Sequence, residues 1–391
     1  MLIKRQAADT LLRYAAQFPV VGITGPRQSG KTTLAKMVFP DKPYVSFDDT
    51  RFRELAASAP ADFLLAFPEG VIIDEAQKVP NIFDAIKLVV DKEPEHAGKY
   101  ILTGSSQFIL HKNMSDSLAG RAVFLKLLPF SIGELHQGQI RLDNPYEMAF
   151  NGFYPPLYDQ RRSFIPTDWF EAYIDMYLDL DVRDQINPSN IASFRKLIQL
   201  CATMSGQLLS MNSMAKHLGV SVPTVKSWLS ILETSYIIHF LQPDSTNLGK
   251  TLVKTPKLYF VDPGLLCHFL RLESKEDLIL SPFKGNVIET FAVSELLKSR
   301  MNQGKKANLT FYRDKNQLEV DIIGEWKHSF AIEIKSDSET EKKLSHAVRK
   351  YLALRTDVPV TGAVFYLGSI AGKFNGINYV PWKQWGDFIS H

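Results

Sequence analysis

The 391-residue sequence predicts an α/β protein built from more than one module. Apolar, β-branched runs alternate with helical stretches from residue 20 to residue 128, a pattern that favours a parallel sheet covered on both faces. Amphipathic helical patterns dominate residues 168–234. A second group of strand-like runs follows after residue 258. We therefore expect a parallel-sheet module, a helical module and a second α/β module, in this order.

Composition adds few constraints on function. The formal net charge of +3 neither requires nor argues against a nucleic-acid partner. Cys201 and Cys267 lie in apolar segments, as expected of buried free thiols in a reducing compartment. No apolar run approaches the length of a membrane span, and residues 1–5 are not followed by a signal-type apolar segment. The sequence thus predicts a cytoplasmic protein with no membrane partner.

The segment from Gly25 to Thr32 fits the pattern G-x-x-x-x-G-K-[ST], the P-loop. A strand-like run precedes it and a helical run follows it, so its backbone N–H groups and the helix N-terminus can face an anion. Lys31 is expected to reach the β- and γ-phosphates of a nucleotide, and Thr32 to hold Mg²⁺. A structural glycine turn is the alternative. The predicted nucleotide-binding residues are Gly25, Pro26, Arg27, Gln28, Ser29, Gly30, Lys31, Thr32 and Thr33.

Two carboxylates follow the apolar run at residues 71–73, in the pattern called Walker B. Asp74 and Glu75 stand at the carboxyl end of this strand, one strand and one helix after the P-loop. Parallel α/β proteins bind ligands outside the carboxyl ends of their strands. We expect Asp74 to hold Mg²⁺ and Glu75 to polarise the attacking water. A solvated strand end is the alternative.

Two further positions are candidates for catalysis. Ser105 follows the strand at residues 100–104 and is expected to sense the γ-phosphate or to orient water, with Ser106 as the second choice. Arg121 precedes a strand at residues 122–128 and is a candidate arginine finger that completes the site of a neighbouring subunit. An ordinary ion-paired surface arginine is the other interpretation of Arg121.

Together these motifs resemble a group of bacterial and archaeal AAA-type P-loop ATPases that carry a C-terminal domain of undetermined role. The resemblance implies an AAA-like core over residues 1–135 that binds ATP with Mg²⁺, and it extends over nearly the whole chain. AAA-type cores often assemble into rings, so a homo-oligomer is a possible partner arrangement. The segments that carry the resemblance are residues 25–32, 71–77 (VIIDEAQ), 102–106 (LTGSS), 118–121 (LAGR) and 128–135 (LPFSIGEL).

Residues 136–190 are predicted to form a connector and a helical lid. The chain is rich in proline, glycine and asparagine over residues 136–162, which indicates exposed turns. An amphipathic helix with an aromatic stripe is expected over residues 168–184. We interpret this stripe as packing, and the helix as a cover for the nucleotide.

Residues 191–250 predict a winged helix-turn-helix. Ala215, Gly219 and Val225 provide a small residue, a turn glycine and an apolar anchor, which two tightly crossing helices require. A wing strand is expected at residues 236–241. The outward residues of the second helix are expected to contact DNA, although this helix is poorly basic and packing is the alternative. These outward residues are Thr224, Lys226 and Ser227.

Residues 251–391 contain a second candidate site. Asp321 lies in a strand at residues 318–323, Glu333 and Lys335 share one face of the next strand, and Glu289 lies on the preceding helix. Carboxylates bind Mg²⁺ through hard oxygens, and a lysine can orient water or stabilise charge during phosphodiester cleavage. The predicted metal ligands are Thr32, Asp74, Glu289, Asp321 and Glu333, and the catalytic residues are Lys31, Glu75, Ser105, Arg121, Asp321, Glu333 and Lys335.

This constellation resembles the D…E-x-K core of restriction-endonuclease-like nucleases. The resemblance implies an α/β fold of that class; an active site, a fold kept only for binding, and plain salt-bridged strands remain open. A helix over residues 341–355 and a closing strand over residues 361–367 are expected to complete the domain. The predicted function is an ATPase that acts on nucleic acid, DNA above all, with Mg²⁺-dependent nuclease activity as an open addition. The alternative is an ATP-dependent switch whose last domains bind DNA or protein without cleavage.

Overall fold

The computed structural model describes residues 2–93, 95–104, 118–183, 185–244, 253–337, 345–356 and 358–388. The first module contains a five-stranded parallel sheet with the strand order β2-β3-β4-β1-β5. Its central strand β1 pairs with β4 on one side and β5 on the other. The strands are β1 (Val20–Thr24), β2 (Tyr44–Ser46), β3 (Val71–Asp74), β4 (Tyr100–Gly104) and β5 (Ala122–Lys126).

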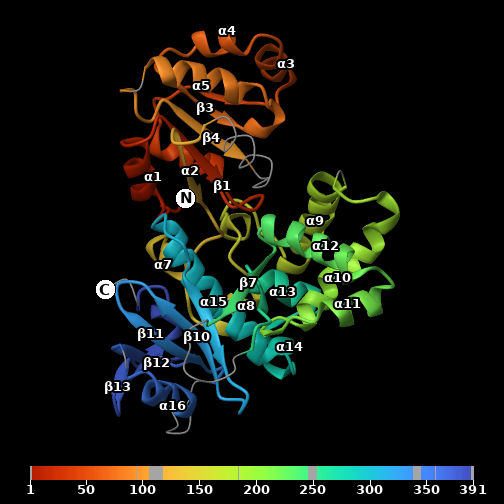
Figure 1. The fold of residues 1–391 in the computed structure, drawn as a ribbon, viewed down its shortest axis with the longest axis vertical. Helices are drawn as coiled ribbons and strands as arrows, with labels where there is room; N and C mark the ends of the chain where they lie inside the picture. The colour runs from red at the N-terminus through yellow and green to blue at the C-terminus, as the bar shows by residue number, and fades with distance from the viewer. Residues whose placement is uncertain are drawn as a thin grey trace.

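Helices cover both faces of this sheet because its strand residues alternate between two cores. Val21 and Ile23 pack with α1 and α2, whereas Val20 belongs to the core beneath α3, α4 and α5. Figure 1 shows this module at the top of the molecule. The parallel α/β fold expected for residues 1–135 is confirmed. The helices are α1 (Ala8–Ala15), α2 (Lys31–Val38), α3 (Thr50–Ser58), α4 (Pro60–Leu65) and α5 (Ile82–Lys92).

The middle of the chain is helical. The aromatic stripe of α9 is buried against Tyr154, with ring centroids 4.8 Å apart for Tyr154 and Tyr173, so it serves packing. A π-helical turn, Leu178–Val182, continues α9. The elements are α7 (Ile132–Gln137), α8 (Pro145–Asn151), a 3₁₀ turn (Pro155–Tyr158), α9 (Pro166–Tyr177), a 3₁₀ turn (Pro188–Asn190), α10 (Ile191–Thr203), α11 (Met211–Leu218) and α12 (Val222–Thr234).

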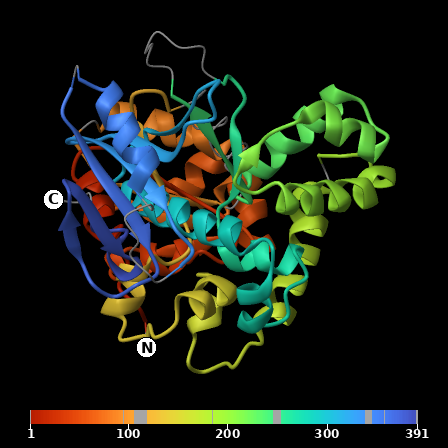
Figure 2. The same ribbon diagram turned by 90° about the horizontal axis from the view of Figure 1, so that it is seen from below.

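Helices α11 and α12 meet at a tight turn. Gly219 ends α11 in the left-handed region with φ +65°, and the Ser221 hydroxyl caps α12 by accepting from the Thr224 N–H at 3.2 Å. Ala215 and Val225 are buried, as the helix-turn-helix pattern requires. Figure 2 shows that the helices from α10 to α12 project away from the rest of the molecule.

A nine-stranded sheet joins this helical part to the C-terminal part, in the order β13-β14-β12-β11-β10-β9-β7-β8-β6. Strand β7 pairs with β8 on one side and with β9 on the other, where Gln242 lies opposite Thr310. The strands are β6 (Gln207–Leu208), β7 (Ile238–Pro243), β8 (Lys257–Phe260), β9 (Leu309–Arg313), β10 (Glu319–Glu325), β11 (Ser329–Ile334), β12 (Val360–Tyr366), β13 (Gly372–Phe374) and β14 (Ile377–Pro381).

Two details of this sheet differ from expectation. The boundary placed at residue 250 falls between two strands that pair with each other, so it marks no break in the sheet. The strand near residues 361–367 does not close the domain, because β14 follows it and pairs with it in parallel. Pairing between distant strands depends on tertiary contacts that a local pattern does not contain.

Helix α15 (Lys284–Asn302) lies between the two sheets (Figure 1). It is buried on nearly every side, and one large hydrophobic core extends around it from Leu128 to Trp385. None of the described helices is long and apolar enough to cross a membrane. The remaining elements are α13 (Pro263–Phe269), α14 (Lys275–Leu280), α16 (His346–Leu354) and a 3₁₀ turn (Trp382–Gln384).

Candidate nucleotide site and a second acidic centre

The P-loop connects β1 to α2 at the carboxyl edge of the parallel sheet. Gly25 is required by close approach, because a Cβ at this position would lie 2.1 Å from the Leu127 carbonyl oxygen. Gly30 caps α2 with φ +91°, a conformation that favours glycine. The loop conformation therefore follows from the two glycines of the motif.

The polar groups of the loop face inward. Lys31 is 7% exposed, and its Nζ donates to the carbonyl oxygens of Gly25 at 3.0 Å and Pro26 at 2.8 Å. Within the described residues, the buried hydroxyl of Ser29 has no hydrogen-bond partner. A cationic side chain held by neutral carbonyls and an unsatisfied buried hydroxyl both suit a bound phosphate.

Asp74 lies at the centre of a cluster of hydroxyl groups. Its carboxylate accepts from Thr32 at 2.9 Å and from Tyr44 at 2.9 Å, and it also accepts from Thr103. Burial, together with the Asp74 carboxylate, raises the pKa of Tyr44 to about 12. A carboxylate beside a threonine hydroxyl is an oxygen donor set that fits Mg²⁺, which when bound would neutralise phosphate charge. Sequence reasoning missed Tyr44 and Thr103, because each lies inside a strand rather than at its carboxyl tip.

Glu75 follows Asp74 with the unusual φ of +54°, which turns the chain sharply after β3. Its carboxylate accepts from the side-chain amide of Gln77 and lines the same cavity as Lys31 and Thr32. A carboxylate in this place can orient a water molecule toward a terminal phosphate.

A cavity of about 520 Å³ opens above the P-loop. Its lining includes P-loop and α2 residues, residues between Pro155 and Phe164, and Met176 from α9. The predicted connector therefore covers this cavity more than the predicted lid helix does. Of the nine predicted nucleotide-binding residues, the following line the cavity: Arg27, Gln28, Gly30, Lys31, Thr32 and Thr33.

Arg5 is a site residue that sequence reasoning missed. This buried guanidinium donates to the Ser29 carbonyl oxygen in the P-loop at 2.6 Å, to the Leu128 carbonyl oxygen at 2.7 Å and to Glu134 at 2.9 Å. It also lies over the Phe130 ring. The N-terminal segment thus connects the P-loop to residues 128–135.

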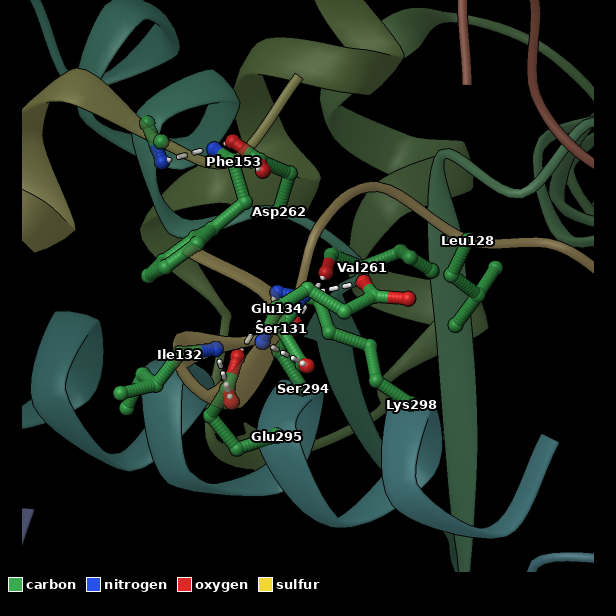
Figure 3. Close-up of polar contacts among 12 residues, drawn as sticks. Leu128, Ser131, Ile132, Glu134, Phe153, Val261, Asp262, Ser294, Glu295 and Lys298 are labelled. Carbon is green, nitrogen blue, oxygen red and sulfur yellow. Dashed lines mark hydrogen bonds and ion pairs between the residues drawn. The ribbon is translucent and has the colours of Figure 1, made fainter. Parts of the chain in front are cut away.

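Residues 128–135 in turn contact α15 through the buried polar network drawn in Figure 3. The Ile132 N–H donates to Glu295 at 2.8 Å, and Glu295 pairs with Lys298 at 2.9 Å, both carboxylate and ammonium being fully buried. Lys298 also lies over the ring of Phe153. The backbone N–H of Phe153 donates to Asp262 at 2.8 Å. The segment LPFSIGEL, residues 128–135, therefore joins the nucleotide module to the C-terminal module.

The other two predicted residues of this module are in different situations. Ser105, like Ser106, lies outside the described residues. Arg121 forms an ion pair with Asp91 and donates to the Ala119 carbonyl oxygen at 2.9 Å. It precedes β5 at the amino edge of the sheet, opposite the P-loop of its own chain. Its role as an arginine finger stays a prediction and requires a neighbouring subunit.

The predicted C-terminal acids meet beside two lysines. Lys335 Nζ pairs with Glu333 at 2.8 Å, and the Ile334 N–H donates to Asp321 at 2.8 Å. Burial, with repulsion from Glu289 and Glu333, raises the pKa of Asp321 well above its usual range. The spacing D…E-x-K therefore does bring these side chains together across β10 and β11.

The second lysine, Lys257, was not expected. It begins β8, is 2% exposed, and places its Nζ 3.0 Å from Glu289 and 2.5 Å from Glu319. Although burial opposes its charge, Glu289, Asp321 and Glu319 raise its pKa. Tyr259 on the same strand also donates to Glu289. Within the part of the chain that the structure describes, no group of three or more His, Cys, Asp or Glu side chains is placed to hold a metal ion.

The sequence matches three families along its length. An AAA domain matches residues 17–136, a domain of unknown function (DUF8612) matches residues 143–276, and another (DUF4143) matches residues 284–385. The uncharacterized protein Rv2008c of Mycobacterium tuberculosis is 30% identical over 343 residues, which are 86% of this chain and 75% of that protein. This chain belongs to the family of Rv2008c.

An archaeal protein extends the range of similarity. The uncharacterized protein MJ1544 of Methanocaldococcus jannaschii is 24% identical over 331 residues, 77% of this chain and 71% of that protein. Among solved structures, a Walker-type ATPase of Pyrococcus abyssi aligns with a TM-score of 0.48 and 15% identity, over 69% of this chain and 96% of that one. With the AAA domain matched over the P-loop, this family member has an AAA-type P-loop ATPase domain.

Proposed function

We propose that this family member is an ATP-dependent switch that acts on DNA through its helix-turn-helix. The contact that carries this proposal joins the nucleotide module to the end of α12. The hydroxyls of Thr24 and Tyr236 lie 3.0 Å apart; Thr24 is the last residue of β1 before the P-loop, and Tyr236 lies two residues beyond α12. Tyr236 is 5% exposed and has φ +60°.

This contact supports coupling because Thr24 ends strand β1 at the P-loop, whereas Tyr236 lies in the turn between α12 and β7. A displacement of the P-loop when the γ-phosphate leaves would change the position of Thr24, and α12 would have to follow or lose the Tyr236 contact. Glu233 and Lys126 form a half-buried pair of opposite charges beside this contact. Burial raises the pKa of Glu233 and lowers the pKa of Lys126. Two packed arrangements of this joint are what a switch requires.

The exposed face of the helix-turn-helix supports DNA as the partner. Lys226 and Ser227 on α12 are exposed, as are Lys216 and His217 on α11. The Thr224 hydroxyl is engaged with Ser221 at 2.8 Å. Cations and hydroxyls on a projecting helix pair can contact phosphates in a major groove.

For the C-terminal domain we propose binding without Mg²⁺-dependent cleavage. The meeting of Asp321, Glu333 and Lys335 favours nuclease chemistry, but the pairing of Lys257 with Glu289 and Glu319 favours the non-cleaving alternative. The role of Arg121 as an arginine finger in a neighbouring subunit's site also stays a proposal, and it would require Arg121 to leave its ion pair with Asp91.

The test measures ATP hydrolysis and DNA binding in the same samples. Wild type, Glu75→Gln and Tyr236→Phe would be assayed with duplex, forked and single-stranded DNA, and fluorescence anisotropy would report binding. We expect ATP to shift DNA affinity in wild type and Glu75→Gln, and this shift to vanish in Tyr236→Phe, which still hydrolyses ATP. Lys226→Glu should weaken binding of every DNA form.

Other outcomes decide against the proposal. Hydrolysis that ignores all three DNA forms, together with no binding of any of them, would eliminate DNA as the partner. Nicking of DNA that requires Mg²⁺ and is lost in Asp321→Ala would restore the nuclease prediction. A nucleotide-dependent shift that survives in Tyr236→Phe would leave the switch intact but remove the Thr24–Tyr236 contact as its basis.

A further inference from the structure

Four carboxylates gather in the C-terminal domain from three elements: Glu289 from α15, Glu319 and Asp321 from β10, and Glu333 from β11. Such a cluster is unstable without positive charge, because like charges at short range repel strongly in a low-dielectric interior. In enzymes that cleave phosphodiesters, a divalent ion supplies this charge. Here the structure offers another source.

The source is Lys257, which reaches the cluster from β8. Its Nζ bridges Glu289 at 3.0 Å and Glu319 at 2.5 Å, carboxylates that belong to different elements. The ammonium is 2% exposed and lies 5.5 Å from the centre of the Phe311 ring. A single cation here connects two carboxylates from separate elements, as a bridging metal ion would.

The remaining acids have cationic or backbone partners as well. Arg313 pairs with Glu319 at 3.2 Å, and Lys335 pairs with Glu333 at 2.8 Å. Asp321 accepts the N–H of Ile334 at 2.8 Å. The described side chains therefore supply three cations to four carboxylates.

We infer that Lys257 is the resident cation of this centre and takes the place of a divalent metal ion. Because the ammonium is part of the chain, its presence in the centre does not depend on the concentration of an ion in solution. It also occupies carboxylate oxygens that a metal ion would use as ligands. Its charge also repels an approaching divalent ion. Of the predicted metal ligands, Glu289 and Glu333 thus pair with lysines, and Asp321 accepts a backbone N–H.

The position of Lys257 gives this centre a structural role. Strand β8, which Lys257 begins, pairs with β6 and β7 next to the helix-turn-helix. The ion pairs of Lys257 with Glu289 on α15 and Glu319 on β10 therefore connect β8 to the C-terminal domain. This inference concerns the C-terminal centre alone, and it stands whether or not the ATPase acts on DNA.

The test is a titration of the full chain with Mn²⁺ in the absence of nucleotide. Binding is measured as the loss of the free Mn²⁺ signal in electron paramagnetic resonance. Wild type, Asp321→Asn, Lys257→Met, Lys257→Arg and the double variant Lys257→Met/Asp321→Asn would be compared. We expect identical titrations for wild type and Asp321→Asn, because the C-terminal acids hold no metal. Lys257→Met should gain one site, at least about tenfold tighter than any in wild type, because hard carboxylate oxygens become available. The double variant should lose this site, and Lys257→Arg should not gain it.

Circular dichroism and thermal unfolding would establish which variants fold. If Lys257→Met does not fold, the comparison of wild type with Asp321→Asn still decides: equal titrations support the inference, and a site lost in Asp321→Asn overturns it. A folded Lys257→Met that binds Mn²⁺ no better than wild type also overturns it. Because nucleotide and DNA are absent from these samples, failure here is distinct from failure of the proposed switch.

Discussion

The nucleotide site and the C-terminal centre contain the same residue types, carboxylates beside a lysine, but they satisfy their charges differently. Asp74 is surrounded by the neutral hydroxyls of Thr32, Tyr44 and Thr103, and Lys31 by backbone carbonyls. In the C-terminal centre, Lys257 bridges two carboxylates directly. Charges held by neutral dipoles remain available to a ligand, whereas charges paired with each other do not.

This difference has a thermodynamic side. A buried ion pair contributes little net stability, but removal of one partner leaves an uncompensated charge that is costly to bury. The carbonyl oxygens of Gly25 and Pro26, which accept from Lys31, are neutral, so its removal leaves no uncompensated charge on these two groups. Substitution of Lys257 should therefore mainly lower stability, whereas substitution of Lys31 should mainly lower ATP hydrolysis.

The largest effect is expected at Lys257. The substitution Lys257→Met removes the cation shared by Glu289 and Glu319 and should lower the free energy of unfolding by about 3–5 kcal/mol. Lys31→Ala should change it by no more than about 1 kcal/mol. Chemical denaturation of both variants measures this. Equal losses in the two would contradict the distinction between the centres.

The second effect is expected at Lys31. Loss of its ammonium removes a positive charge from the place where γ-phosphate charge develops, so Lys31→Ala should reduce ATP hydrolysis by roughly 10²–10³-fold. Phosphate release in steady state measures this, with Lys92→Ala, an exposed lysine of α5, as the matched control. A reduction in Lys31→Ala no greater than in the control would remove the P-loop from the reaction.

The residues of these two centres show what a sequence can predict. Lys31, Thr32 and Asp74 were found because a local motif specifies both their spacing and the strand, loop and helix around them. The β-strand period likewise places Glu333 and Lys335 together. Local patterns of this kind carry the fold class and the centre of each site.

Contacts between distant segments were not predictable in the same way. Arg5 meets Glu134 across 129 positions of sequence, and Lys257 meets Glu289 across 32. Pairing of β7 with β9, which joins two expected modules into one sheet, is also a tertiary event. A single lysine before an apolar run gives no local sign that its ammonium will be buried among carboxylates.

A third effect concerns pH and the joint between the nucleotide module and the helix-turn-helix. Burial, and then Lys126, lowers the pKa of His239 to about 4 from its ordinary value of 6.5. The folded protein therefore binds fewer protons here than the unfolded chain. The stabilisation is complete above pH 6.5 and is lost as pH falls toward 4, by roughly 2–3 kcal/mol for this partly screened ring.

Denaturation at several pH values between 4 and 8 measures this contribution, with His239→Gln as the reference because its amide does not titrate. The difference in slope between wild type and His239→Gln isolates the histidine from the carboxylates that also titrate in this range. Parallel pH profiles for the two proteins would show that His239 is charged as readily in the folded state as in the unfolded state.

The smallest effect is expected at Tyr44, and it tests whether neutral hydroxyls set the availability of Asp74. Tyr44→Phe removes one of three donors to the carboxylate but leaves Thr32 and Thr103 in place. Loss of one such supporting hydrogen bond should raise the Mg²⁺ concentration that gives half-maximal hydrolysis by about tenfold. Tyr100→Phe is the matched control, because Tyr100 is buried at the start of the neighbouring strand β4 near Glu93, away from Asp74. If both variants require the same Mg²⁺ concentration as wild type, the hydroxyl cluster does not tune Asp74, and the contrast between the two centres would then depend on the lysines alone.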